Sequence, residues 1–191
     1  TNGAIPASGS VSFYLRLFNA KHPFTLPRDY NVTIAPVSRS WDEGTGLDMD
    51  SYTDSGSANW QSASSSSAGV VHWTSAGGDF HTTPQFSTYF DKGTEDLEVE
   101  ITWLVEEWIS GSGAGAGGST LGKENDGVSI YLSNETAFSS SYTKKFFARG
   151  SEFFFKRPVI EARWESAKKD NRGNFYYSSS LAPAADNLNT L

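Results

Sequence analysis

Apolar residues recur at every second position in several short segments of this chain. The segments are 11–17, 30–34, 97–103 and 128–132. A period of two places alternate side chains on opposite faces of a β-strand, so each segment is predicted to bury one face. Ser, Gly, Asn and Asp are frequent between the segments and favour turns. The pattern therefore predicts an all-β fold, a jelly-roll-like β-sandwich.

Apolar runs and polar stretches complete this pattern. Three more apolar runs lie at 146–148, 152–155 and 158–164, separated by Gly150 and Pro158. The stretch 110–122 is nearly pure Gly, Ser and Ala, and 62–69 is a shorter stretch of the same kind. Such segments carry few side chains that can pack, so both are expected to be exposed, mobile loops.

One segment departs from the period of two. Leu104, Val105, Trp108 and Ile109 fall at i, i+1, i+4 and i+5, which predicts about two turns of helix over 102–109, packed across the end of the sandwich. Thr102 is the expected N-cap and Gly111 the expected stop. Trp103 and Trp108 are both expected to be buried.

The chain length fits one substantial core. A chain of 191 residues matches a single domain, which we expect at 11–164, with a linker at 1–10 and a linker or the start of another domain at 165–191. The first residue is Thr1 and the single methionine is Met49. We therefore expect one module of a longer protein.

Charge and cysteine content exclude several classes. There is no cysteine, so we expect neither disulfides nor thiolate metal sites. The 15 basic residues are scattered among 22 acidic ones, giving a net charge of −7, which disfavours nucleic-acid binding. No apolar run approaches the roughly 18 residues that a membrane span requires.

Catalytic patterns are weak. The segment 117–123 fits the spacing of a phosphate-binding loop, but Glu124 stands where Ser or Thr would hold magnesium. His22, His72 and His81 are the possible bases for a nucleophile, yet the chain has neither a G-x-S-x-G motif nor metal-binding histidine spacing. We expect no enzyme, with hydrolase or lyase activity as a minor alternative.

Carboxylates and aromatic residues supply the candidate binding sites. A structural calcium ion is possible in a glycine-rich acidic loop, because calcium takes many oxygen ligands; a solvated loop is the alternative. Exposed aromatic rings could stack on sugars or line a protein interface. The calcium candidates are Asp42, Glu43, Asp48 and Asp50, and the carbohydrate-binding candidates are Tyr52, Trp60, Trp73 and Tyr89.

Six short motifs occur in order over about residues 11–164. They are Trp41-Asp42-Glu43-Gly44-Thr45-Gly46, Asn59-Trp60, Gly77-Gly78-Asp79-Phe80, Leu97-x-Val99-x-Ile101-Thr102 followed by Val105 and Trp108, Asn125-Asp126-Gly127-Val128, and Arg157-Pro158-Val159-Ile160. Their order resembles the DNRLRE family, a jelly-roll sandwich akin to carbohydrate-binding modules of extracellular bacterial proteins and disaggregatase-like enzymes. The resemblance implies that Trp41 anchors a core edge and Trp108 seals the sandwich end. Ile101 departs from the acidic residue usual in the family, and the stretch 110–122 exceeds its usual short turn.

The last third of the chain carries a second resemblance. The segments 146–164, 170–177 and 181–191 are similar to virion structural proteins of tailed phages, particularly marine ones. This implies a tail, fibre or capsid-surface protein in a virion, with other virion proteins or copies of itself as partners. We expect a structural or attachment module that can contact host glycans. The alternative is a carbohydrate-binding module of a secreted bacterial polysaccharide-active protein.

Overall fold

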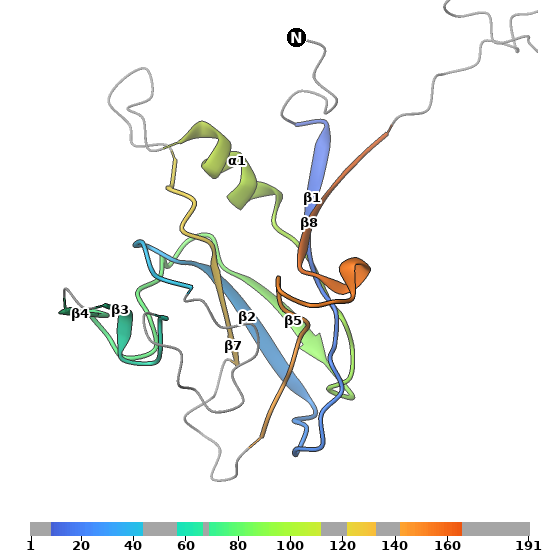
Figure 1. Ribbon diagram of the computed structural model, residues 1–191. Coiled ribbons are helices and arrows are strands. Elements are labelled where there is room, and N and C mark those ends of the chain that lie inside the picture. Colours follow the sequence, from blue (N-terminus) through green and yellow to red (C-terminus); the bar gives the residue numbers. More distant parts are fainter. Residues whose placement is uncertain (1–8, 44–56, 67–68, 112–121, 133–141, 166–191) are drawn as a thin grey trace, which may run out of the picture.

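The computed structural model describes residues 9–43, 57–66, 69–111, 122–132 and 142–165 (Figure 1). Eight strands and one α-helix lie in these ranges, together with the short 3₁₀-helix η2 (Phe154–Lys156). The strands and α-helix, in chain order, are β1 (Val11–Leu17), β2 (Tyr30–Pro36), β3 (Ser62–Ser66), β4 (Gly69–His72), β5 (Phe86–Phe90), β6 (Leu97–Glu100), α1 (Thr102–Ser110), β7 (Val128–Leu132) and β8 (Val159–Trp164).

Two three-stranded antiparallel sheets form the body of the molecule. Their strand orders are β6-β1-β8 and β5-β2-β7, so the central strand of each comes from the first 36 residues. Inward residues of both central strands belong to one buried cluster, including Phe13 and Leu15 of β1 and Val32 and Ile34 of β2. Two sheets that share a core in this way make an all-β sandwich, as the alternation predicts.

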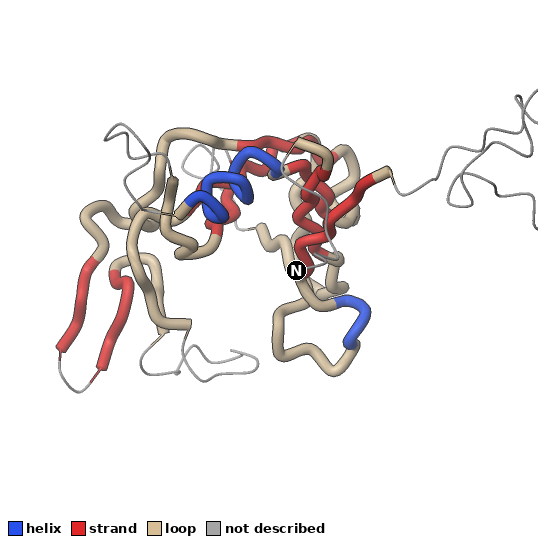
Figure 2. The backbone as a smooth tube through the Cα atoms, turned by 90° about the horizontal axis from the view of Figure 1, so that it is seen from above, coloured by secondary structure: helices blue, strands red, loops and turns tan. Residues whose placement is uncertain are grey.

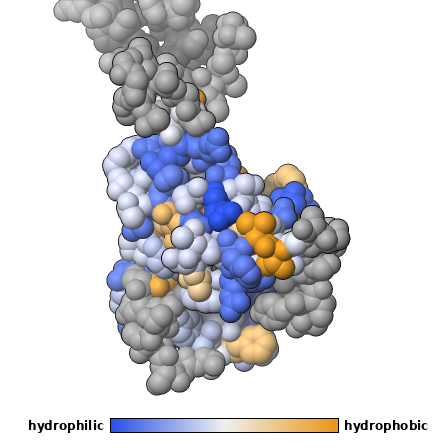
Figure 3. Space-filling model, turned by 90° about the vertical axis from the view of Figure 1, so that its left-hand side faces the viewer, coloured by the Kyte–Doolittle hydropathy of each residue, from blue (hydrophilic) through white to orange (hydrophobic). Residues whose placement is uncertain are grey.

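The third sheet is the β3–β4 hairpin, which stands apart from the two main sheets (Figures 1 and 2). Val70 and Val71 of this hairpin are about half exposed. Figure 3 shows the side of the molecule on which the hairpin lies, where apolar surface borders hydrophilic residues. The prediction of a mobile loop at 62–69 is wrong for Ser62–Ser66. Backbone pairing with β4 forms this strand although its residues are four serines and one alanine.

The predicted helix is confirmed as α1. Leu104 and Val105 are buried, and Trp108 packs against the core. The helix ends at Gly111, whose N–H donates to the carbonyls of Glu107 and Trp108 and whose φ of 68° lies in the left-handed region. The N-cap prediction is wrong: the cap is Ile101, and the Thr102 hydroxyl instead accepts a hydrogen bond from the Phe13 N–H at 2.9 Å.

Trp103 is 56% exposed, so the prediction that it is buried is wrong. In the strand pattern Trp103 continues the buried positions 97, 99 and 101, but the strand ends at Glu100. The helix that follows turns about 100° per residue, which places position 103 on the side opposite Leu104 and Val105. Among the described residues, no helix is long and apolar enough to cross a membrane.

Of the three apolar runs near the end, only the last forms a strand. Phe146 makes an isolated bridge to Asn19, and 154–156 form η2. The third run is β8, the edge strand that pairs with β1.

An ion-pair ladder crosses the outer face of the β6-β1-β8 sheet. Arg16 contacts Glu98 at 3.2 Å and Glu161 at 2.9 Å, while Arg163 contacts the same two carboxylates at 2.8 and 3.1 Å. Each arginine thus contacts one carboxylate on β6 and one on β8. Hydrogen bonds from Arg163 and then Arg16 lower the pKa of Glu161 from 4.5 to about 2.

This lowered pKa predicts an acid-dependent loss of stability. The contribution of Glu161 is present above its unfolded pKa of 4.5 and is lost as the pH falls toward its folded pKa of about 2. In thermal melts over this window, the midpoint of Glu161→Gln should therefore fall less steeply with pH than that of the wild type. Glu152→Gln, which changes an exposed carboxylate outside the ladder, is the control and should follow the wild type. Parallel curves for all three proteins would contradict the prediction.

Candidate functional site

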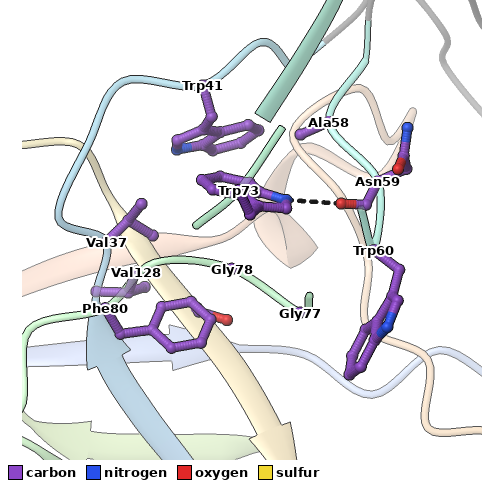
Figure 4. A pocket seen from close by; sticks show the side chains of 11 residues that line it. Val37, Trp41, Ala58, Asn59, Trp60, Trp73, Gly77, Gly78, Phe80 and Val128 are labelled. Atoms are coloured by element: carbon purple, nitrogen blue, oxygen red, sulfur yellow. Dashed lines mark hydrogen bonds between the residues drawn. The ribbon is translucent and has the colours of Figure 1, made fainter. Parts of the chain in front are cut away.

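Three tryptophans meet at one open pocket of about 270 Å³ (Figure 4). Trp41 follows β2, Trp60 precedes β3, and Trp73 follows β4. Trp60 is the most open of them, with 60% of its surface exposed, whereas Trp41 is 39% exposed. We call this site the tryptophan pocket.

Backbone hydrogen bonds bring these three segments together. The Trp73 N–H donates to the Gln61 carbonyl at 3.0 Å and closes the base of the β3–β4 hairpin. The Asp42 N–H donates to the Ala63 carbonyl at 2.9 Å, which ties the segment of Trp41 to the same hairpin. The pocket therefore depends on contacts between residues 12 and 21 positions apart in the chain.

Two of the indole rings are fixed by their own N–H groups. Nε1 of Trp41 donates to the Asp126 carbonyl, and Nε1 of Trp73 donates to the Asn59 carbonyl, both at 2.7 Å. Tryptophan has a single side-chain donor, so these bonds hold each ring in one orientation and leave its carbon faces for contact. The site consequently presents preorganised aromatic surface.

The ring of Trp60 lies against a glycine. A Cβ atom at Gly77 would come within 2.9 Å of Cη2 of Trp60, and the φ of Gly77 is +100°. The Gly77 N–H also donates to the Trp60 carbonyl at 2.7 Å. Only glycine satisfies both the left-handed backbone and the close approach of the ring.

Asp79 holds the turn that presents Gly77 and Gly78. Its carboxylate accepts the N–H groups of Thr74 at 3.0 Å and Ser75 at 3.2 Å, and it contacts the Arg39 guanidinium at 3.4 Å. The backbone hydrogen bond from Thr74 is the largest cause that lowers the pKa of Asp79. The carboxylate therefore stays ionised and keeps the turn closed at neutral pH.

Apolar side chains of the sandwich form the remaining wall of the pocket. Val37, Phe80 and Val128 line it, and the Phe80 ring stacks on Tyr131 of β7 with centroids 5.6 Å apart. Val37 and Phe80 also form an isolated β-bridge. The pocket is thus attached to the β2–β7 edge of the sandwich rather than to the hairpin alone.

Substituting Gly77 by alanine is expected to displace the Trp60 ring while the sandwich stays folded. The added methyl group overlaps Cη2 of Trp60, and the positive φ disfavours a side chain. In a two-dimensional NMR spectrum of the indole N–H groups, the Trp60 signal should shift and that of Trp103 should not. Gly9→Ala is the matched control, because Gly9 also has a positive φ, +85°, but open space around it. An unmoved Trp60 signal would contradict the close contact.

The structure brings together two of the four predicted carbohydrate-binding residues. Trp60 and Trp73 both line the tryptophan pocket. Tyr89 lies on β5 opposite Asn31, outside the pocket, and its hydroxyl donates to Asp29 at 3.0 Å. Tyr52 lies outside the described residues.

Sequence reasoning missed two ring systems of the pocket, Trp41 and Phe80. Trp41 was expected at a core edge, but it is 39% exposed and faces Trp73 in the pocket (Figure 4). The adjacent Gly77-Gly78 pair was the available signal, since neighbouring glycines often mark a close approach of rings to backbone.

The calcium prediction stays open. Asp48 and Asp50 lie outside the described residues. Glu43 makes a two-point contact with Arg149, at 3.0 and 2.7 Å, while Asp42 uses its backbone to bind the hairpin. Within the described ranges, no group of three or more potential ligand side chains lies close enough to hold a metal ion.

A serine and a histidine also meet, across the hairpin. Nδ1 of His72 lies 3.2 Å from Oγ of Ser62, because the register of β3 and β4 places these residues opposite each other. Ser62 is only 4% exposed. The contact joins the two strands of the hairpin.

The fold and the site define an all-β sandwich with an open aromatic pocket at one edge. Comparison of the chain with protein-family models, curated proteins and solved structures finds no match.

Proposed function

We propose that this chain is a non-enzymatic attachment module of a phage virion, in a tail, fibre or capsid-surface protein, and that it contacts host glycans through the tryptophan pocket. One observation carries the glycan part of the proposal. Three indole rings surround a single open pocket, and two of them have their N–H groups bonded to the protein.

The chemistry of a sugar ring suits this arrangement. A pyranose has a face of C–H groups that packs on an aromatic ring, while its hydroxyls remain at the rim for polar groups and water. A volume of about 270 Å³ lies just below the usual range for small-molecule sites. It fits one sugar unit of a longer chain, whose neighbours extend from the open mouth.

The virion setting is supported by sequence resemblance and by exposed apolar surface. The segment 146–164 resembles virion structural proteins, and within it Phe154 and Phe155 are 68% and 88% exposed. Exposed aromatic side chains of this kind favour contact with other proteins of an assembly. The alternative setting, a secreted bacterial polysaccharide-active protein, would use the same pocket as a carbohydrate-binding module.

Binding and setting are tested separately. The purified chain should quench or shift its tryptophan fluorescence saturably when it is titrated with some member of a panel of neutral and acidic cell-surface oligosaccharides. Absence of binding across the whole panel would overturn the glycan part. Mass spectrometry of purified phage particles should detect the chain; its presence only in particle-free bacterial medium would favour the secreted alternative.

A further inference from the structure

Strand β8 exposes apolar side chains on its inward side. Ile160 and Trp164 project to the same face as the core residues of β1, yet they are 45% and 39% exposed. In its sheet β8 is the last strand, and no described residue pairs with its outer edge. An edge of this kind is able to accept another strand.

The hydrogen bonds of β1 reveal which backbone groups face that edge. The Phe13 N–H donates to Thr102 and its carbonyl accepts from Ile101, so both groups of Phe13 point away from β8. Phe13 lies opposite Ala162. Because the backbone groups of Phe13 do not bond to β8, these two residues form a non-hydrogen-bonded pair, in which the backbone groups of each residue point away from the other strand. The N–H and C=O of Ala162 therefore face the outer edge, and so do those of Ile160 and Trp164.

We propose that a second copy of this chain adds its own β8 to this edge in antiparallel orientation, with Ala162 opposite Ala162 of the second copy on a two-fold axis. The two sheets then join into one continuous six-stranded sheet. The residues whose backbone groups face the outer edge must lie opposite the same kind of residue in the second copy, or no hydrogen bonds form between the strands. The other possible registers are therefore shifted from this one by two residues, not by one.

Charge selects one of these registers. With Ala162 on the axis, Glu161 lies opposite Arg163 of the second copy, and the symmetry repeats this pair. A shift of two residues in one direction brings Glu161 against Glu161, and a shift in the other brings Arg163 against Arg163. Like charges directly opposite are unfavourable, whereas the central register extends the ion-pair ladder across the interface.

The same register covers the exposed apolar side chains. Ile160 lies opposite Trp164 of the second copy on the inward face, and the symmetry again doubles the contact. The paired strand is only six residues long. Its area is smaller than that of a typical stable interface, about 1,600 Å², so the dimer is expected at micromolar rather than nanomolar concentration.

Sedimentation velocity of the 191-residue chain over a concentration series tests this dimer. Ala162→Pro removes one outward N–H, which an edge strand tolerates, and should give a monomer with an unchanged melting temperature. Ile160→Lys should also abolish the dimer. Val71→Lys is the matched control, because Val71 is equally exposed, at 45%, on the separate hairpin; it should still dimerise. A wild type that remains monomeric into the millimolar range would overturn the proposal.

A crosslinking experiment tests the register even if the proline variant fails to fold. The chain has no cysteine, so Ala162→Cys introduces the sole thiol. Residues that face each other in a hydrogen-bonded antiparallel pair have Cα atoms about 5.5 Å apart, which suits a disulfide. Mild oxidation should give a covalent dimer of Ala162→Cys and much less of Val71→Cys. Equal yields from the two variants would overturn this register.

Discussion

Replacing Lys144 by alanine should lower the free energy of unfolding by about 2–4 kcal/mol. Nζ of Lys144 donates to Oδ1 of Asn19 at 2.7 Å and to the carbonyls of Gly93 and Glu95, both at 2.8 Å. These bonds use all three ammonium hydrogens. The substitution leaves three acceptors without this donor in a half-buried site.

Two aromatic rings add to the effect. The Lys144 ammonium lies 4.9 Å from the centroid of Phe90 and 4.7 Å from that of Phe146. Burial lowers the pKa of Lys144, while Glu95 and Asp96 oppose the shift. A cation held between two rings and three oxygens joins the segment 142–147 to the sandwich, where Phe90 is only 1% exposed.

Urea denaturation of the wild type and three variants measures this contribution. Lys144→Met keeps the length of the side chain but not its charge, so it should recover only the packing part of the loss. Lys145→Ala changes the adjacent, exposed lysine and should stay within about 0.5 kcal/mol of the wild type. If Lys144→Ala were as stable as Lys145→Ala, the role of the buried ammonium would be refuted.

Replacing Trp60 by alanine should weaken glycan binding by about 30-fold or more, which corresponds to a loss of about 2 kcal/mol. Trp60 offers the largest exposed ring of the tryptophan pocket, and Trp41 and Trp73 are held by hydrogen bonds that do not involve its side chain. The substitution should therefore remove a stacking surface without unfolding the protein.

Trp103→Ala is a closely matched control for this experiment. Trp103 is 56% exposed, close to the 60% of Trp60, but it lies on α1 outside the pocket. Isothermal titration with the best glycan of the panel should give a wild-type affinity for Trp103→Ala. If Trp60→Ala retained full affinity while the wild type bound, the glycan site would lie elsewhere, although the attachment role could stand.

Local pattern predicted most of the strands of the sandwich and the helix. The alternation appears as buried and less buried positions along all of β1 and over residues 30–34 of β2, because side-chain direction in a strand follows directly from the order of residues. At the end of β2, Ala35 and Pro36 are both buried. The strand β3 was missed because Ser62–Ser66 has no apolar alternation, and its pairing comes from β4. Propensity is a weak guide where a neighbouring strand supplies the hydrogen bonds.

Two of the four aromatic rings in the tryptophan pocket could be predicted from the sequence. Trp60 and Trp73 are candidates for exposed aromatic rings from the sequence, but so is Tyr89, which lies outside the pocket on β5. The prediction for Trp103 is wrong because position 103 continues the buried positions of the strand pattern, whereas the residue lies in the first turn of α1 and its side chain points to solvent. Whether a residue near a boundary is exposed depends on the position at which the strand ends and the helix begins, and the spacing of apolar residues predicts such boundaries poorly.

The sequence alone determined the all-β class and the position of the one described α-helix, since both follow from the spacing of apolar residues along the chain. The tertiary structure decided which tryptophans meet and which backbone groups of β8 face its outer edge. Both depend on contacts between distant segments, such as the Asp42 bond to Ala63 and the pairing of Phe13 with Ala162. No local period carries that information, because the register between strands is set only when the sheets form.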